Sequence, residues 1–198
     1  MNHYYTNDPT LAHDEHQFNF DLAGHTLAFT ADNGVFSKHT IDYGSRVLID
    51  AVVAADLPAG AILDVGCGYG PIGLALAKHW PDRHVTMSDV NERALGLAER
   101  NATANGITNV TILESSVYDQ IDGDFAVIVT NPPIRAGKAI VSGILAGAYD
   151  HLQPGGQLFA VLQKKQGAPS ALKLMKATFA AAEVVTKAHG YYILRAIK

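Results

Sequence analysis

Short apolar runs alternate with amphipathic stretches along this chain from about residue 61, and this alternation limits the folds that it can adopt. The expected strands are residues 61–65, 84–88, 110–113, 125–130 and 157–162. The expected helices are residues 71–79, 92–105, 139–151 and 168–180, where apolar side chains recur at helical spacing. Repeated strand–helix–strand units pack as a parallel sheet with helices on both faces, so the pattern predicts an α/β, doubly wound fold.

Both ends of the chain depart from this alternation. Residues 18–22 and 27–30 flank a glycine-containing turn and predict a small N-terminal β-hairpin, and residues 41–55 have the spacing of an amphipathic helix. Residues 184–187 and 191–197 are separated by only three residues, which is too short for a helical crossover. We therefore expect these last two strands to pair antiparallel.

The length of 198 residues and the hydrophobic content of 48% suit one globular domain. We expect residues 1–198 to form a single domain, with residues 1–40 as an extension that carries the hairpin and residues 41–198 as the catalytic core. No apolar run of about 18 residues, the length that spans a membrane, is present. Residues 1–8 lack the basic and apolar segments of a secretory signal.

Cysteine and histidine usage indicates neither a disulfide nor a metal site. The single cysteine, Cys67, cannot form an internal disulfide, which fits a reducing compartment and predicts a cytoplasmic protein. The nine histidines are scattered, and none falls in a cluster with the spacing of known metal ligands. We therefore expect no metal, while the oligomeric state stays open.

The net charge of −4 hides an asymmetry between the two parts of the chain. Residues 1–130 contain 17 acidic and 6 basic side chains, whereas residues 131–198 contain 2 acidic and 9 basic ones. A basic part of this kind indicates a polyanionic partner such as a nucleic acid. Lysines on solvated helix faces would produce the same count, so the charge alone does not decide.

Asn131-Pro132-Pro133-Ile134 directly follows the apolar run at 125–130. Both prolines lack an N–H group and hold φ at about −65°, and Asn131 is kept extended because it precedes a proline. The result is a stiff edge rich in hydrogen-bond acceptors, which suits the N–H groups of a planar amino group. Taken alone, the same residues could equally well do no more than end a strand.

Residues 62–73 read as a strand, a glycine turn and the start of a helix. Gly68, Gly70 and Gly73 match the G-x-G-x-x-G pattern, and Asp89 lies 19 residues after Gly70, at the end of the next expected strand. Glycines let the backbone approach a ligand, and the acid can accept hydrogen bonds from both ribose hydroxyls. The combination predicts a nucleotide-type cofactor.

Asp64 distinguishes between the possible cofactors. A dinucleotide would place its pyrophosphate at the glycine turn, where a carboxylate two residues before Gly66 is unfavourable. S-adenosylmethionine has no phosphate, and it carries a sulfonium and an ammonium group that an acidic side chain attracts. The sequence therefore favours S-adenosylmethionine, and a nicotinamide-dependent oxidoreductase is the alternative from another class of enzyme.

The motifs together resemble class I S-adenosylmethionine-dependent methyltransferases that act on exocyclic or amide nitrogens. The motifs that carry this resemblance are residues 64–70 (Asp-Val-Gly-Cys-Gly-Tyr-Gly), Asp89 and Asn131-Pro132-Pro133. More closely, residues 34–37, 42–45, 131–138 and 163–168 are similar to those of the small-subunit ribosomal RNA guanine-N2 methyltransferase family. The resemblance covers the chain from about residue 17, and it implies a Rossmann-like, mostly parallel seven-stranded sheet that ends in an antiparallel hairpin.

The resemblance also implies a role for each residue of the site. The residues that it places at the cofactor are Asp64, Gly66, Cys67, Gly68, Gly70, Asp89, Val90, Ser116, Val117 and Asn131. The glycines would line the methionine moiety, Asp89 would hold the ribose, and Ser116 and Val117 would lie by the adenine. As catalytic residues, Asn131 and the carbonyl of Pro132 or Pro133 would accept hydrogen bonds from the target amino group and align its lone pair for in-line attack.

Substrate contacts are expected from Phe36, Ile134, Arg135, Lys164 and Lys165. Ile134 stands where related nitrogen methyltransferases often have an aromatic residue, so Phe36 or Tyr43 could stack on the target base instead. Ser116 stands where many relatives have an acid that reads the adenine amine. Lys164 and Lys165 could contact phosphates, provided that the strand before them neighbours the strand before Asn131.

The leading hypothesis is methylation of a guanine N2 amine in ribosomal RNA, with RNA or a ribosomal particle as the partner. A base that is methylated on an edge amine has to be unpaired or extruded first. Because Asn-Pro-Pro also suits a protein glutamine amide or an adenine N6 amine, these substrates remain alternatives, as does a module that binds cofactor and RNA without catalysis. Longer members of the family carry a second, degenerate domain, and this chain shows only one.

Overall fold

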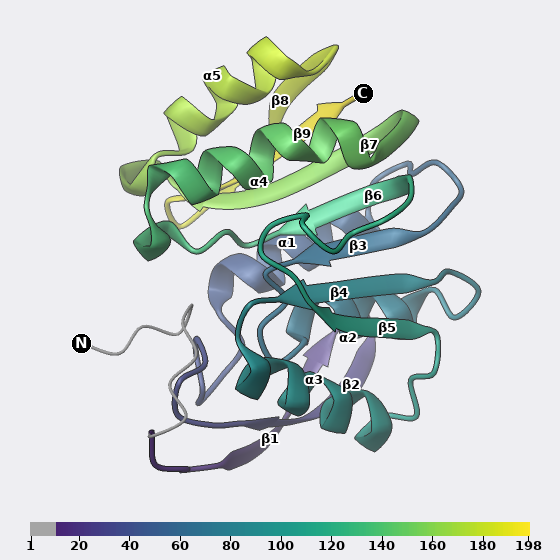
Figure 1. Cartoon of the computed structure of the whole chain (residues 1–198), viewed down its shortest axis with the longest axis vertical. Coiled ribbons are helices and arrows are strands. Elements are labelled where there is room, and N and C mark those ends of the chain that lie inside the picture. Colours follow the sequence, from purple (N-terminus) through teal and green to yellow (C-terminus); the bar gives the residue numbers. More distant parts are fainter. Residues whose placement is uncertain (1–10) are drawn as a thin grey trace.

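The computed structural model describes residues 11–198, and its central feature is one large sheet with helices on both sides (Figure 1). The strands of this sheet are β3 (Ile62–Val65), β4 (Val85–Asp89), β5 (Val110–Glu114), β6 (Phe125–Thr130), β7 (Leu152–Gln163), β8 (Ala181–Ala188) and β9 (Tyr191–Ile197). A separate two-stranded sheet consists of β1 (His16–Leu22) and β2 (His25–Ala31). The α-helices are α1 (Tyr43–Val53), α2 (Pro71–His79), α3 (Glu92–Ala104), α4 (Lys138–His151) and α5 (Ala168–Thr178), and two short 3-10 helices are η1 (Ile134–Ala136) and η2 (Lys164–Gln166).

The large sheet has the strand order β5-β4-β3-β6-β7-β9-β8. Strands β5 to β7 are parallel, and β9 runs antiparallel to both β7 and β8. The predicted α/β fold with seven strands, a C-terminal antiparallel hairpin and a small N-terminal hairpin is therefore confirmed. Two strands are longer than predicted, since β7 begins at Leu152 and β8 at Ala181. Residues 1–8, from which we expected no secretory signal, lie outside the described part of the chain.

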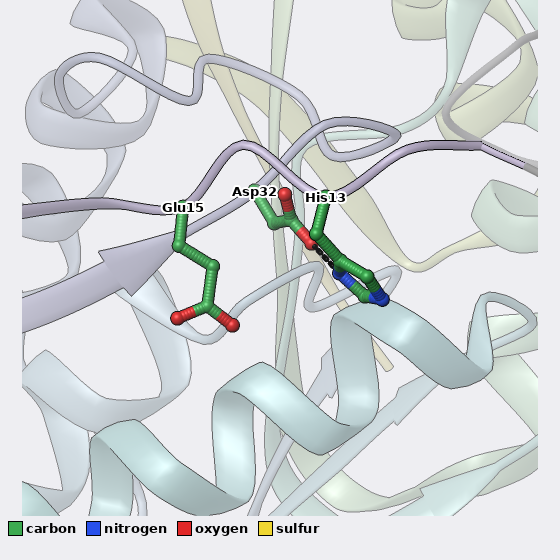
Figure 2. A group of neighbouring side chains, drawn as sticks. All are labelled: His13, Glu15 and Asp32. Atoms are coloured by element: carbon green, nitrogen blue, oxygen red, sulfur yellow. Dashed lines mark hydrogen bonds and ion pairs between the residues drawn. The ribbon is translucent and has the colours of Figure 1, made fainter.

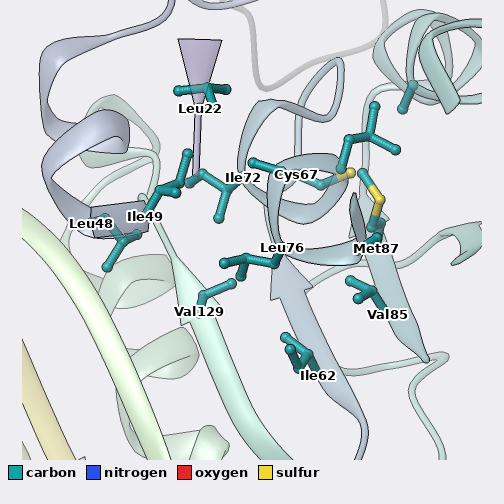
Figure 3. Close-up of a cluster of buried hydrophobic side chains, with 14 of the residues drawn as sticks. Leu22, Leu48, Ile49, Ile62, Cys67, Ile72, Leu76, Val85, Met87 and Val129 are labelled. Carbon is teal, nitrogen blue, oxygen red and sulfur yellow. The ribbon is translucent and has the colours of Figure 1, made fainter. Parts of the chain in front are cut away.

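The sheet separates two hydrophobic cores. The strands alternate their side chains between the faces, so that Ile62 packs on one side and Leu63 on the other. One core joins the sheet to α1, α2, α3 and the N-terminal hairpin, and Figure 3 shows Leu48 of α1 and Leu76 of α2 among its members. The other core lies under α4 and α5, where Met175 is fully buried. Helices on both faces explain why strands such as β6 are buried throughout.

The N-terminal hairpin is fastened to the core by side-chain amides of Asn101 in α3 and of Asn105, the C-cap of this helix. Its two-residue turn, Ala23 and Gly24, has positive φ values of 51° and 81°, as tight hairpin turns require. Asn105 bonds the backbone N–H and C=O of Ala28, and Asn101 does the same at Thr30. Asn101 also donates to the carbonyl of Tyr69 at 2.9 Å, which ties the hairpin to the glycine turn.

The strand order reverses between β3 and β6, which are neighbours although they are far apart in the sequence (Figure 1). Val65 and Thr130, the last residues of these strands, are in register, and the Thr130 hydroxyl donates to the Val65 carbonyl at 2.9 Å. Gly66 and Asn131 therefore leave the sheet side by side. In open α/β sheets a ligand site forms at such a reversal, beyond the carboxyl ends of the strands.

Charge is divided across the sheet in the same way as along the sequence. The acidic first part supplies the hairpin, α3, β4 and β5 at one end of the sheet, and the basic last part supplies α4, α5, β7, β8 and β9 at the other end (Figure 1). Within the described range, none of the helices is long and apolar enough to cross a membrane.

Candidate active site

A cavity of about 840 Å³ lies at the point where the strand order reverses, and most of the predicted site residues line it. On the side of the glycine turn these residues are Gly66, Cys67, Gly68, Asp89, Val90, Ser116 and Val117. On the side of the Asn-Pro-Pro segment they are Phe36, Asn131, Pro132, Pro133, Ile134 and Arg135. Four predicted residues lie outside the cavity wall, namely Asp64, Gly70, Lys164 and Lys165.

The glycine turn leaves room for a ligand at two positions. Gly66 and Gly68 have positive φ values of 76° and 57°, and a Cβ atom added to either would meet no atom within 4 Å. These positions face open space, and a side chain there would both strain the backbone and fill the cavity. The N–H groups of Gly66 and Cys67 donate to the carbonyl of Ser88, which holds the turn against the end of β4.

Asp89 is fixed at the end of β4 by the backbone around it. Its Oδ2 accepts the N–H of Gly68 at 2.8 Å, and its Oδ1 accepts the N–H of Asn91 at 3.0 Å. Burial raises the pKa of this carboxyl, although the N–H groups of Asn91 and Gly68 oppose that effect. A carboxylate oxygen can accept more than one hydrogen bond, so both oxygens keep capacity for the hydroxyls of a ligand.

Val117 marks the adjoining wall with a strained backbone. Its φ of 54° is in the left-handed region, which a β-branched residue rarely adopts. The turn that holds it is closed by the N–H of Gln120, which donates to the Ser115 hydroxyl at 3.1 Å. Backbone strain of this kind is often found where a loop shapes a ligand site.

Asp64 lies beneath the glycine turn and not in the cavity wall, which corrects the expectation of a direct contact with the cofactor. Its side chain is fully buried, and Oδ2 accepts the N–H of Gly73 at 2.8 Å. No described residue donates to Oδ1. Burial raises the pKa of this carboxyl to about 7, with a smaller contribution from Asp89 and an opposing one from the Gly73 N–H. Asp64 therefore supports the start of α2 and carries a proton over part of the physiological pH range.

This raised pKa predicts a pH-dependent stability. Unfolded Asp64 ionises near the ordinary value of 3.8, whereas the folded protein keeps the proton until about pH 7. Native stability from this group is thus fully present below the ordinary value and is lost as the pH rises through about 7. Asp64→Asn keeps an acceptor for the Gly73 N–H but cannot ionise. We therefore expect the Tm of the variant, relative to that of the wild type at the same pH, to increase between pH 5 and pH 8. Asp50→Asn, at an exposed position of α1, is the control; a Tm difference for Asp64→Asn that does not change with pH would contradict the assignment.

Asn131 is held by two residues that precede it by almost ninety positions in the sequence. Its Nδ2 donates to Oδ2 of Asp42 at 3.1 Å and to Oγ of Ser45 at 3.0 Å. Within residues 11–198, no group donates to Asn131 Oδ1. Asp42 is also the N-cap of α1, where it accepts the N–H of Ser45. The contacts of Asp42 and Ser45 with Asn131 were not predicted from the sequence, in which these two residues belong to the similar motif at residues 42–45.

The two proline carbonyls differ in their hydrogen bonds. The Pro133 carbonyl accepts the N–H of Ala136 at 2.9 Å in the short helix η1. For the Pro132 carbonyl no donor is found among the described residues. Of the two carbonyls, that of Pro132 therefore keeps its full capacity to accept hydrogen bonds.

The mouth of the cavity carries two exposed apolar side chains. Phe36 is 46% exposed and Ile140 is 37% exposed, and both line the cavity. The loop that bears Phe36 is tied down by the Tyr69 hydroxyl, which lies 3.2 Å from the carbonyl of Ser37. Tyr43, the other aromatic residue expected to stack on a base, lies outside the cavity wall and packs its ring against Tyr191.

Lys164 and Lys165 follow β7, which neighbours β6 in the sheet, so the condition for a common rim with Asn131 is met. Both lysines are exposed. The residues on either side of them, Gln163 and Gln166, line the cavity. The lysines therefore lie next to the cavity entrance without forming its wall. Both glutamines belong to the similar motif at residues 163–168, but no role was predicted for either.

One cluster of possible metal ligands occurs in the described part of the chain, and it is already neutralised. Ligand atoms of His13, Glu15 and Asp32 lie within 4.8 Å of one another (Figure 2). Nδ1 of the His13 ring lies 2.5 Å from Oδ2 of Asp32, whose Oδ1 accepts two backbone N–H groups. Glu15 pairs with both terminal nitrogens of Arg100. The Arg93 guanidinium lies 3.5 Å from Asp32. This network fastens residues 13–15 to α3, and it explains the cluster without a metal.

Residues 26–195 match the methyltransferase small domain family, and this span is most of the chain. The chain belongs to that family. It is an S-adenosylmethionine-dependent methyltransferase, as predicted from the glycine turn and the Asn-Pro-Pro segment, and the nicotinamide-dependent alternative is set aside. The open glycine positions and the fixed carboxylate of Asp89 suit this cofactor, because they offer space and hydrogen-bond acceptors.

Relatives of this methyltransferase include the uncharacterized protein YbxB of Bacillus subtilis, which is 48% identical over 99% of this chain and 98% of the relative. The ribosomal RNA small subunit methyltransferase C of Aeromonas hydrophila is 44% identical over 70% of this chain and 41% of the relative. Among solved structures, the 16S rRNA N2 G1207 methyltransferase of T. thermophilus, in complex with AdoMet and guanosine, superposes with a TM-score of 0.84. It is 25% identical, and the match covers 96% of this chain and 52% of the neighbour. This methyltransferase thus spans about half the length of the named ribosomal RNA methyltransferases that it matches.

Proposed function

We propose that this methyltransferase transfers a methyl group to the exocyclic N2 amine of a guanine in ribosomal RNA. The observation that carries the proposal is the orientation of Asn131. Its NH2 group is occupied by Asp42 and Ser45, so its oxygen is the polar atom left to act at a cavity that it shares with Gly68 and Asp89. A hydrogen-bond acceptor at this place selects a substrate atom that carries hydrogen, as an amine does.

The residues around the cavity divide into two sets in this proposal. Asp89 would hold the ribose, Gly66 and Gly68 the methionine part, and Val90, Ser116 and Val117 the adenine, with Cys67 in the adjoining wall. Asn131 Oδ1 and the Pro132 carbonyl would accept the two N–H groups of the target amine. S-adenosylmethionine, when bound, supplies an electrophilic methyl group on a sulfonium.

The chain's contribution to the chemistry is alignment. Two acceptors on the amine draw its lone pair out of conjugation with the base and point it at the methyl carbon. The nitrogen lone pair then forms the N–C bond, the S–C bond breaks, and S-adenosylhomocysteine leaves as a neutral thioether. The extra proton on nitrogen passes to solvent, so no general base with a tuned pKa is required.

RNA as the substrate is supported by the surroundings of the cavity. Phe36 and Ile134 offer apolar surface for a base that has left its stack, and Phe36 stands at the mouth. Arg135, Lys164 and Lys165 are exposed beside the entrance, on the basic end of the sheet, where they would meet phosphates. Relatives whose names specify ribosomal RNA match 70% or more of this chain.

The class of substrate can be tested directly. Extract from cells that lack the protein is incubated with pure protein and S-adenosylmethionine labelled on the methyl group, and is then digested with nuclease or with protease. We expect nuclease to release the label and protease to leave it bound. Label that only protease releases would replace the RNA substrate by a protein amide, and the absence of label would favour a module that binds without catalysis.

The phosphate role of the lysines makes a separate prediction. Lys164→Ala combined with Lys165→Ala should weaken RNA binding and reduce the slope of log affinity against log salt by about 1 to 2, because each phosphate contact releases roughly one counterion. Lys173→Ala with Lys176→Ala, at exposed positions of α5, removes the same charge away from the cavity and is the matched control. Equal salt slopes for the two double variants would argue against the role.

A further inference from the structure

Catalysis by Asn131 requires that its amide point the correct way, and an amide can fit its site in two ways. The oxygen and the NH2 group are nearly equal in size, so shape alone does not choose between them. With the oxygen toward the cavity, Asn131 accepts a hydrogen bond from an amine. With the NH2 group toward the cavity, it would place a donor against the donors of the amine and would disfavour binding.

The side chains next to Asn131 determine which orientation its amide adopts. The amide nitrogen lies 3.1 Å from Oδ2 of Asp42 and 3.0 Å from Oγ of Ser45. An ionised carboxylate only accepts hydrogen bonds, whereas a hydroxyl can either donate or accept. Turning the amide over would set its oxygen against the Asp42 carboxylate, two acceptors in contact. The charge on Asp42 therefore selects the orientation, and Ser45 adds a second acceptor.

Asp42 is itself held in place, which makes it a firm reference for the amide. Its Oδ2 accepts the N–H of Ser45 at 3.1 Å as the cap of α1, and Ser45 is buried. Gly44 permits this close packing, because a Cβ at that position would lie 2.7 Å from the ring of Tyr191 and 3.0 Å from Asp42 Oδ2. The helix start thus carries the carboxylate to the end of β6.

We infer that Asp42 is a positioning residue, which keeps the Asn131 amide turned so that its oxygen faces the substrate amine. The inference rests on the proposed function, because the orientation of Asn131 matters for catalysis only if its oxygen accepts a hydrogen bond from the substrate amine. Ser45 assists; both residues also line the cavity, and the role assigned to them acts through the amide of Asn131. Residues 42–45, at the start of α1, would thus act on methyl transfer by holding the side chain of Asn131 at the end of β6.

Asp42→Asn is the most informative variant, because asparagine caps a helix about as well as aspartate but can also donate. Its NH2 group would satisfy Asn131 Oδ1 and permit the turned amide. We expect kcat to fall on the order of tenfold or more, with the affinity for S-adenosylhomocysteine and the Tm close to those of the wild type. Asp50→Asn removes the same charge from an exposed position of α1 and should keep the wild-type kcat.

Two further measurements separate positioning from a general structural effect. In an Asn131→Ala background, Asp42→Asn should cause no additional loss of activity, because the amide that it orients is gone; a persistent loss would overturn the inference. Independently of any substrate, the side-chain NH2 protons of Asn131, assigned by their disappearance in Asn131→Ala, should exchange slowly with solvent in the wild type and faster in Asp42→Asn. Equal exchange rates in the two proteins would refute the orienting contact. Failure of the wild type to methylate RNA would instead count against the proposed function alone.

Discussion

Asn131→Ala should lose about a hundredfold or more of the methyl-transfer rate, since removing one well-placed hydrogen-bonding group from a reacting centre commonly costs that much. The side-chain NH2 group of Asn131 donates to Asp42 and Ser45, and its oxygen remains for the substrate. The substitution should therefore lower turnover. Calorimetry with S-adenosylhomocysteine should give an affinity close to that of the wild type, because the carboxylate and the glycine turn remain.

The control for this variant is Asn19→Ala, an identical truncation at an exposed position of β1. Retained turnover in Asn131→Ala would remove the catalytic role from the Asn-Pro-Pro segment. A parallel loss of cofactor affinity and turnover would instead make Asn131 part of the cofactor site only.

Asp89→Ala should weaken cofactor binding and leave turnover at saturating cofactor largely intact, which is the reverse of what we expect for Asn131→Ala. The variant removes the carboxylate that receives the Gly68 N–H and that would hold the ribose, so we expect cofactor affinity to fall about tenfold to a hundredfold, the range for hydrogen bonds to a charged group. At saturating cofactor, much of the turnover should return, because Asn131 and Pro132 are untouched. Calorimetry and initial rates over a range of S-adenosylmethionine concentrations measure both effects.

Asp122→Ala, at an exposed position before β6, is the matched control for the lost charge. Unchanged cofactor affinity in Asp89→Ala would show that the residue is not the ribose acceptor. A turnover that stays low at saturation would show that it also acts on the chemistry.

Much of the fold could be predicted because its signals are local. Apolar strands, helical spacing and the short connection before β9 lie within a few residues of one another, and they determine a parallel sheet with an antiparallel end. The bounds were less accurate where tertiary pairing extends a strand, as at Leu152, which pairs with Phe125 across an irregularity. Local sequence carries no signal for that extension.

The site was predictable where each residue follows a strand end, and less so where distant segments meet. The placement of Asp64 was wrong because its position beside the glycines suggested a ligand contact, whereas β3 is buried throughout and Asp64 bonds the Gly73 N–H beneath the turn. The contact of Asn131 with Asp42 joins residues 89 positions apart, so no spacing rule could reveal it. Asp42 caps α1 through the N–H of Ser45, and only the fold brings this helix start to the end of β6.

Identifying the modified nucleoside tests most directly whether this protein methylates the N2 amine of guanine in ribosomal RNA. Small-subunit particles and their naked ribosomal RNA, both from cells that lack the protein, are each treated with the pure protein and S-adenosylmethionine, and the RNA is digested to nucleosides for mass spectrometry. We expect N2-methylguanosine to appear in at least one of the two substrates and to be absent when Asn131→Ala replaces the wild type. Methylation of a different base, or of guanosine at an atom other than N2, would contradict it.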